Sequence, residues 1–223
     1  MIAGAFLPVR TWAAQALRPI RDAVDHIVIG ISDLEKGIET IAAKTGVRPA
    51  IGGSHPGRGT WNALFSLGPN QYAELVAPDP KQKGTPDVYG LPAIAEPRLL
   101  MWAASTPDID GLAARLKAAG RSDVEVRPGS RVRPDGRKLA WRTLATSGND
   151  GLLPFFIQWD AGTTHPSTDS PAGCRLESLV LSAPDPAAVE RGLAALGLAA
   201  RPVPGPAPLL RATLATPKGP FSL

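Results

Sequence analysis

The alternation of apolar and polar positions predicts a fixed order of strands and one amphipathic helix near the start of the chain. Residues 24–32, VDHIVIGIS, form an apolar run typical of a buried strand. Apolar residues then recur at helical spacing until Gly46, a residue type that often ends helices. Ser32 is the predicted N-cap, because Glu35 follows three residues later in a capping-box pattern. Further strands are predicted near 48–52, at 60–68 and at 71–78.

The same order of elements recurs in the next part of the chain. A strand at 98–106 precedes a helix over 107–120, and further strands are predicted near 123–127, at 138–147 and at 153–160. The tetrapeptide WNAL at 61–64 matches WRTL at 141–144, at an offset of about 75 to 80 residues from the first unit. The chain therefore contains two units of the order βαβββ, which predicts an α+β fold.

A third strand-helix opening at 174–198 and a strand at 209–217 suggest a truncated third unit. The exposed strand edges of such a unit favour a homodimer. The predicted organisation is an N-terminal arm at 1–21, a first unit at 22–80, a linker or lid at 81–97, a second unit at 98–160, and a linker with the truncated third repeat at 161–223.

Composition narrows the class of partner. The net charge is +4, and the basic residues are scattered, so no nucleic-acid-binding stripe is visible. A small acidic ligand fits this weakly positive net charge. No apolar stretch approaches the roughly 20 residues that a membrane span needs, and no secretory signal is recognised. The single cysteine, Cys174, excludes an internal disulfide framework, and we expect a cytoplasmic protein.

Five stretches resemble one known group of proteins: DHIVIGISDLE, HPGRGTWNALFSLG and YAELVAPDP in the first unit, and WRTL and LPFFIQWD in the second. Together they are similar to the glyoxalase-like domain branch of the vicinal oxygen chelate superfamily, which also includes glyoxalase, bleomycin resistance and extradiol dioxygenase proteins. This resemblance implies curved mixed sheets that enclose a cleft between the two units. In metal-dependent members, residues of the first and fourth strands of each unit hold a divalent ion in that cleft.

In the first unit, the resemblance places His26 and Glu74 at the metal-ligand positions. Imidazole and carboxylate are ordinary ligands for zinc, nickel, manganese or iron. The alternative is a buried pair of His26 with Glu74 and no metal.

The second unit departs from the metal-binding pattern. Met101 stands at the first-strand position, and its thioether is a poor donor for hard ions. Gln158 stands at the fourth-strand position as a weaker ligand, and His55 or His165 would have to complete the set from a loop.

Strand alternation gives candidates for ligand binding. Asn62 is expected to face the cleft, because Trp61 and its apolar neighbours belong against the helix. By the repeat, Arg142 takes the same inward position, where its guanidinium would hold an anion. The alternatives for Arg142 are an ion pair with Glu74 or an outward position. His55 and Arg58 are predicted at the rim, in a loop at 52–63 whose glycines are assigned to turns.

Two functional interpretations follow. The first is a glyoxalase-like lyase or isomerase for a small anionic carbonyl or hydroxy compound, in which Glu74 moves a proton and Arg142 holds the acid group. The second is a metal-free protein of the same fold that binds or sequesters a small molecule, as resistance proteins do. Met101 favours the second interpretation, and the pair of His26 with Glu74 favours the first.

Overall fold

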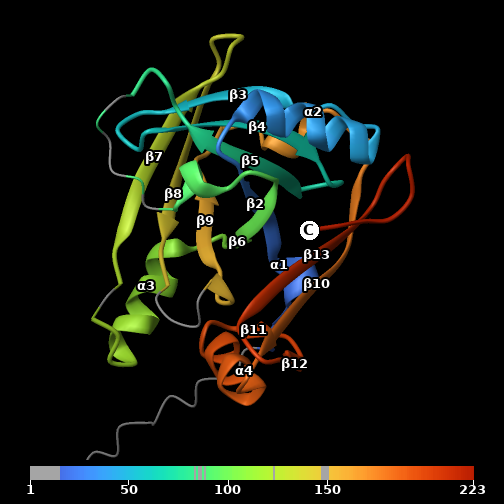
Figure 1. Ribbon diagram of the computed structural model, residues 1–223. Coiled ribbons are helices and arrows are strands. Elements are labelled where there is room, and N and C mark those ends of the chain that lie inside the picture. The colour runs from blue at the N-terminus through green and yellow to red at the C-terminus, as the bar shows by residue number, and fades with distance from the viewer. Residues whose placement is uncertain (1–15, 83, 85–86, 88, 123, 147–150) are drawn as a thin grey trace, which may run out of the picture.

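The computed structural model describes residues 16–82, 84, 87, 89–122, 124–146 and 151–223. Its main feature is an eight-stranded, strongly curved mixed sheet with the strand order β3-β4-β5-β2-β6-β9-β8-β7 (Figure 1). The first half of the sheet comes from β2 (Val24–Gly30), α2 (Leu34–Thr45), β3 (Ala50–His55), β4 (Thr60–Ser66) and β5 (Tyr72–Pro78). The second half comes from β6 (Arg98–Ser105), α3 (Ile109–Ala118), β7 (Val126–Val132), β8 (Lys138–Leu144) and β9 (Phe155–Trp159). The predicted α+β fold of paired βαβββ units is confirmed.

The two units join through their first strands. Strand β2 pairs in parallel with β5 and antiparallel with β6, so that it lies at the centre of the sheet. Helix α2 covers the outer face of β4 and β5, while α3 covers the outer face of the second half (Figure 1). The inner face is left to line the interior of the curved sheet.

Helix α2 begins one residue later than the sequence pattern predicts. The N-cap is Asp33, whose side chain accepts a hydrogen bond from the Lys36 backbone N–H, and the predicted N-cap Ser32 is therefore wrong. The helix ends as expected at Gly46, which adopts a left-handed φ of 80°. Its buried face packs on the sheet through apolar residues that include Leu34, Ile38 and Ile41.

The edge strands β3 and β7 meet, and we call their contact at residues 52–53 and 131–132 the seam. Arg131 of β7 donates to the Gly52 carbonyl oxygen, and the Arg131 side chain is buried. A Cβ at Gly52 would lie 2.3 Å from Asn62 Oδ1, and one at Gly53 would lie 2.6 Å from the Val132 carbonyl oxygen. These two glycines lie in β3 and are needed for close packing, so assigning them to turns was wrong.

We expect Gly53→Ala to destabilise the protein by about 1 to 3 kcal/mol. The φ of Gly53 is 131°, where an L side chain is strained, and the clash is with backbone that has little freedom to move. Chemical denaturation of the variant and of Gly57→Ala measures the effect. Gly57 also has a positive φ, 74°, but no atom within 4 Å of the added Cβ, so the difference between the variants isolates the seam. Equal losses would show that the seam contributes nothing.

Alternation along the strands separates the core from the interior of the curved sheet. On β4, Ala63 and Phe65 are fully buried in the main core with the partly buried Trp61, whereas Asn62 points inward to polar partners. On β2, Ile27 and Ile29 belong to the same core, and His26 faces inward. The apolar outer face stabilises the sheet, and the inner face holds the polar side chains from which a functional site can form.

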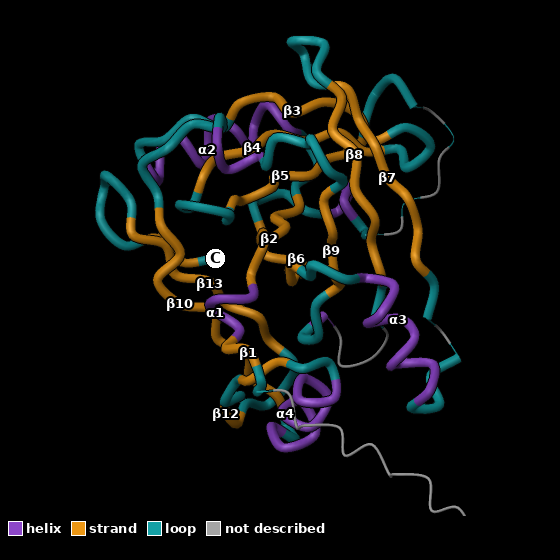
Figure 2. Tube along the Cα trace, turned by 180° about the vertical axis from the view of Figure 1, so that it is seen from behind, coloured by secondary structure: helices purple, strands orange, loops and turns teal. Residues whose placement is uncertain are grey.

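The remaining chain forms a separate four-stranded sheet with the order β12-β10-β13-β14 (Figure 2). Its elements are β10 (Arg175–Ala183), α4 (Pro186–Ala195), β12 (Val203–Pro204), β13 (Leu209–Ala215) and β14 (Phe221–Ser222). The short elements are β1 (Arg18–Pro19), which pairs with β11 (Leu198–Ala199), then α1 (Ile20–Ala23), and the 3-10 turns η1 (Leu91–Ala93) and η3 (Pro166–Thr168). Most of the predicted N-terminal arm lies outside the described residues. Among the described helices, none has the length and apolar character of a membrane span.

Candidate functional site

A carboxylate at the centre of the inner face, Glu74 of β5, is held by side chains from three other strands. Its Oε1 accepts a 2.6 Å hydrogen bond from Asn62 Nδ2 and lies 3.4 Å from His55 Nε2. Its Oε2 lies 3.6 Å from His26 Nε2, and the side chain is 12% exposed. The structure therefore brings together four of the residues selected from the sequence.

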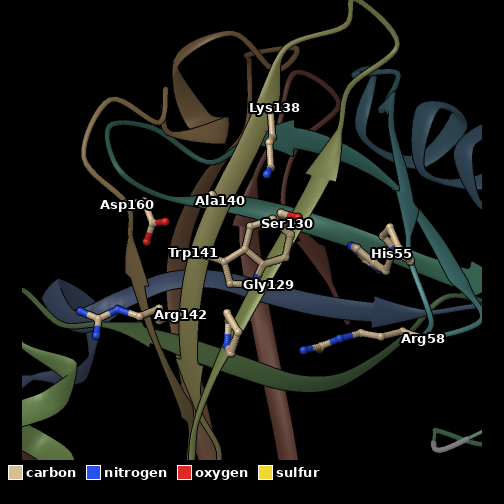
Figure 3. A pocket seen from close by; sticks show the side chains of 11 residues that line it. His55, Arg58, Gly129, Ser130, Lys138, Ala140, Trp141, Arg142 and Asp160 are labelled. Carbon is tan, nitrogen blue, oxygen red and sulfur yellow. The ribbon is translucent and has the colours of Figure 1, made fainter.

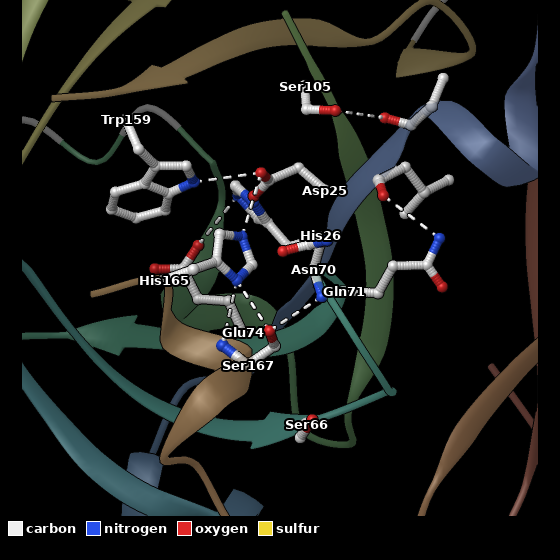
Figure 4. A network of polar contacts seen from close by, with 12 residues as sticks. Asp25, His26, Ser66, Asn70, Gln71, Glu74, Ser105, Trp159, His165 and Ser167 are labelled. Carbon is white, nitrogen blue, oxygen red and sulfur yellow. Dashed lines mark hydrogen bonds and ion pairs between the residues drawn. The ribbon is translucent and has the colours of Figure 1, made fainter. Parts of the chain in front are cut away.

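A second buried carboxylate, Asp25, extends this group behind His26 (Figure 4). Asp25 Oδ1 lies 2.7 Å from His26 Nδ1, while Oδ2 accepts from Trp159 Nε1 at 3.0 Å and lies 3.2 Å from His165 Nε2. The sequence analysis did not select Asp25, because strict alternation would put it on the opposite face from His26. A bulge between Val24 and His26 in the pairing with β6 changes the local geometry.

The resulting Glu74 cluster consists of Asp25, His26, His55, Asn62, Glu74 and His165. Burial by itself would raise the pKa of Asp25, but hydrogen bonds from His165 and His26 outweigh it and hold the pKa at about 2. Burial likewise opposes ionisation of Glu74, but His55, the charge of His26 and the Asn62 amide lower its pKa to about 2. Both carboxylates are therefore ionised at neutral pH.

Aromatic side chains hold the cluster in place. The rings of His26 and Tyr72 are stacked with centroids 4.6 Å apart, and Phe155 contacts the His26 ring edge-on at 5.4 Å. Burial, reinforced by the nearby charges of Glu74 and Asp25, raises the pKa of Tyr72 well above its usual value. The phenol is consequently neutral, and the imidazole of His26 is fixed between a ring and two carboxylates.

Two polar groups near the cluster are left with few partners. Asn62 Oδ1 is buried and has no hydrogen-bond partner among the described residues. Arg131 is 3% exposed, and its side chain donates to the Gly52 carbonyl oxygen. Sequence reasoning missed Arg131, because its burial depends on closure of the seam between strands about 80 residues apart, which no local pattern reports.

A pocket of about 490 Å³ opens beside the cluster, between the turn that follows β3 and the paired strands β7 and β8 (Figure 3). His55 belongs to both the pocket lining and the cluster. Arg58 and Lys138 point into it toward Trp141, and neither forms an ion pair with any described residue. The predicted rim residues His55 and Arg58 thus lie in the pocket lining, and their role in binding stays a prediction.

Arg142 lines the pocket together with Arg58 and Lys138, but neither Arg142 nor Gln158 points into the interior of the sheet, contrary to the prediction. Arg142 Nη1 pairs with Asp110 of α3 at 2.6 Å, and Nη2 donates to Gln158 Oε1 at 3.1 Å. Gln158 also accepts from the Ile109 backbone N–H at 2.9 Å. The inward position on β8 belongs to Trp141, because the match of WNAL with WRTL is displaced by one residue and a shift of one reverses the faces.

The donor set does not fit the chelated divalent ion that the resemblance implies. Within the described ranges, no three His, Cys, Asp or Glu side chains are grouped as a metal site. His26 and His55 face different oxygens of Glu74, and Gln158 is bound to the start of α3. The second unit instead contributes Phe155 and Trp159 beside the cluster.

Several solved structures are similar to this chain. A hypothetical protein from Staphylococcus aureus superposes with a TM-score of 0.59 at 18% identity, covering 78% of this chain and 74% of that chain. Methylmalonyl-CoA epimerase from Mycobacterium tuberculosis gives a TM-score of 0.41 at 19% identity, covering 67% and 93%. A methylmalonyl-CoA epimerase variant from Streptomyces coelicolor gives 0.43 at 20% identity, covering 64% and 97%. No curated protein matches the sequence.

The sequence also matches a family model directly. The match runs from residue 24 to residue 197 and includes both βαβββ units, the Glu74 cluster and the pocket. The family is described as the glyoxalase-like domain. The chain therefore belongs to the glyoxalase-like domain family.

Proposed function

We propose that the protein is a glyoxalase-like lyase or isomerase that acts on a small anionic carbonyl or hydroxy compound. One observation carries this proposal: a buried cluster of ionised carboxylates and histidines adjoins a pocket that has two unpaired cations. Perturbed titratable groups beside a pocket are typical of catalytic sites. Arg58 and Lys138 take the anchoring role that the sequence analysis gave to Arg142.

In this proposal the reacting end of the substrate passes His55 and meets Glu74, which accepts a proton from carbon. A carboxylate with a pKa of about 2 is a weak base. Bound substrate strengthens it by taking the hydrogen bonds of His55 and Asn62, both of which lower the pKa of Glu74 in the free protein. His26 is a positioning residue, because Asp25 holds its ring toward Glu74.

The second candidate function is metal-free binding or sequestering of a small anion. It is favoured by the lack of a grouped metal-ligand set among the described side chains and by the hydrogen bonds that already satisfy Glu74. Both functions use the same pocket and cations, and they differ in whether the bound molecule reacts.

A panel of 2-hydroxy and 2-oxo acids tests the proposal. Nuclear magnetic resonance would follow binding and conversion of each acid by the native protein and by the Arg58→Gln/Lys138→Gln double variant. We expect binding of at least one acid, an affinity loss of about tenfold or more in the double variant, and conversion by the native protein. Binding without conversion would establish the second candidate instead. Binding that is equally strong in the double variant would contradict the assignment of the pocket.

A further inference from the structure

We infer that the pocket takes a planar aromatic carboxylate, with the indole of Trp141 as the surface on which the ring stacks. This inference rests on the proposed function, because it assumes that the same pocket holds the ligand. It adds the chemical class of the ligand and the residue that selects it. Three features of the described residues support the inference: the placement of Trp141, the unpaired donors around its indole, and the apolar groups of the pocket lining.

The indole of Trp141 lies against the backbone of β7, because the opposite residue is a glycine. A Cβ at Gly129 would lie 2.5 Å from Trp141 Nε1 and 2.6 Å from Cε2. Trp159 and His55 contact the indole edge-on, with ring centroids 5.5 and 6.5 Å away. These contacts fix the orientation of the ring, and Trp141 still lines the pocket and is only partly buried.

The donors around this indole are unpaired. Figure 3 shows Arg58 and Lys138 pointing toward Trp141 from two sides. Among the described residues, neither cation has an ion-pair partner, and the Trp141 Nε1–H has no hydrogen-bond acceptor, whereas Trp102 and Trp159 each donate to one. The carboxylate of a ring stacked on the indole would accept from Arg58 and Lys138.

The rest of the lining indicates where the acid group and the ring lie. Asp160 lies across β8 from Arg58 and repels an anion, so the carboxylate belongs on the side of Arg58 and Lys138 (Figure 3). Pro56 and Pro128 add rigid apolar groups to the pocket lining. A cavity of about 490 Å³ is of the size that holds a one-ring or two-ring molecule. A flat ring fits such a lining better than a flexible aliphatic chain.

Three small probes of similar size test this inference: benzoate, cyclohexanecarboxylate and benzamide. Dissociation constants would be measured by titration for the native protein, Trp141→Leu and Trp141→Phe. For the native protein we expect benzoate to bind about tenfold or more tightly than either other probe. We expect Trp141→Leu to remove the preference over cyclohexanecarboxylate, and Trp141→Phe to retain most of it.

Two further variants separate the role of the Trp141 indole from a general effect on the fold. Trp61→Leu removes an indole from the outer face of β4 and is expected to leave the preference unchanged. Gly129→Ala retains the indole but displaces it from the β7 backbone, and is expected to weaken benzoate binding. Equal binding of benzoate and cyclohexanecarboxylate to the native protein would overturn the aromatic inference and leave the proposed function standing. Failure of both carboxylates to bind would overturn the inference, and the panel of 2-hydroxy and 2-oxo acids would then decide separately whether the proposed function stands.

Discussion

Replacing Asp25 with alanine is expected to lower the free energy of unfolding by about 3 to 5 kcal/mol, the usual cost of removing one partner of a buried charged pair. Asp25 is 2% exposed and lies within hydrogen-bond distance of three side chains. His26 Nδ1, Trp159 Nε1 and His165 Nε2 would all lose their acceptor. These three groups come from β2, β9 and the segment after β9. Loss of the Asp25 carboxylate therefore weakens the contact between the first and the second unit.

Urea denaturation of the native protein and of the Asp25→Ala variant measures this difference. Asp110→Ala is the matched control, because Asp110 also pairs with a cation, but its side chain is 69% exposed. Exposed pairs contribute about 1 kcal/mol or less. A loss at Asp25 no larger than that at Asp110 would show that the buried network does not stabilise the fold.

The same variant has a predicted pH dependence. The folded-state pKa of Asp25 is lowered from 3.8 to about 2, so ionised Asp25 favours the folded state above pH 3.8. This contribution is about 2 kcal/mol at neutral pH and is lost as the pH falls from about 4 to 2. The stability difference between native protein and variant should shrink over that range when followed by denaturation at each pH. A constant difference would contradict the assignment.

Replacing Glu74 with glutamine is expected to reduce turnover of the substrate by about 100-fold or more while the substrate still binds. Removal of a general base costs on the order of 10² to 10⁴ in rate. Glutamine keeps the shape of the side chain and an oxygen that accepts from Asn62, but it does not accept a proton from carbon. The anchoring cations Arg58 and Lys138 are unchanged, so KM should change much less than kcat.

Steady-state kinetics of Glu74→Gln test this split, with Glu177→Gln, at an exposed position of β10, as control. Folding of Glu74→Gln is checked by thermal denaturation, because the change also removes a charge beside His26 and His55. A variant that folds and retains native kcat would remove Glu74 from the reaction.

The fold was predictable because the same order of strands and helix occurs twice in the chain. Two βαβββ units, the boundaries of most strands and the inward position of Asn62 follow from alternation and from the repeat. The sequence predictions were wrong where a displacement of one residue changes the N-cap of a helix or the face of a strand. Helix α2 starts from Asp33 and not from Ser32, and Trp141 takes the inward position expected of Arg142.

Other features of the site depend on contacts that no local pattern contains. Asp25 joins the cluster through a bulge in β2, and His165 reaches it from a loop 140 residues later in the chain. Arg131 is buried because β3 and β7 close on each other, which also explains Gly52 and Gly53. Such long-range contacts are set by packing of the whole sheet, and local propensity does not predict them.

Uptake of solvent deuterium by a bound 2-hydroxy or 2-oxo acid tests the central claim most directly, because it reports proton transfer to and from carbon. The native protein and Glu74→Gln would be incubated with the tightest-binding acid in deuterium oxide, and the ligand signals would be followed by nuclear magnetic resonance. We predict that native protein introduces deuterium at C3 of a 2-oxo acid or at C2 of a 2-hydroxy acid, and that Glu74→Gln does so at a rate about 100-fold or more lower. Equal rates for the two proteins, or a bound acid that takes up no deuterium with either, would contradict the account.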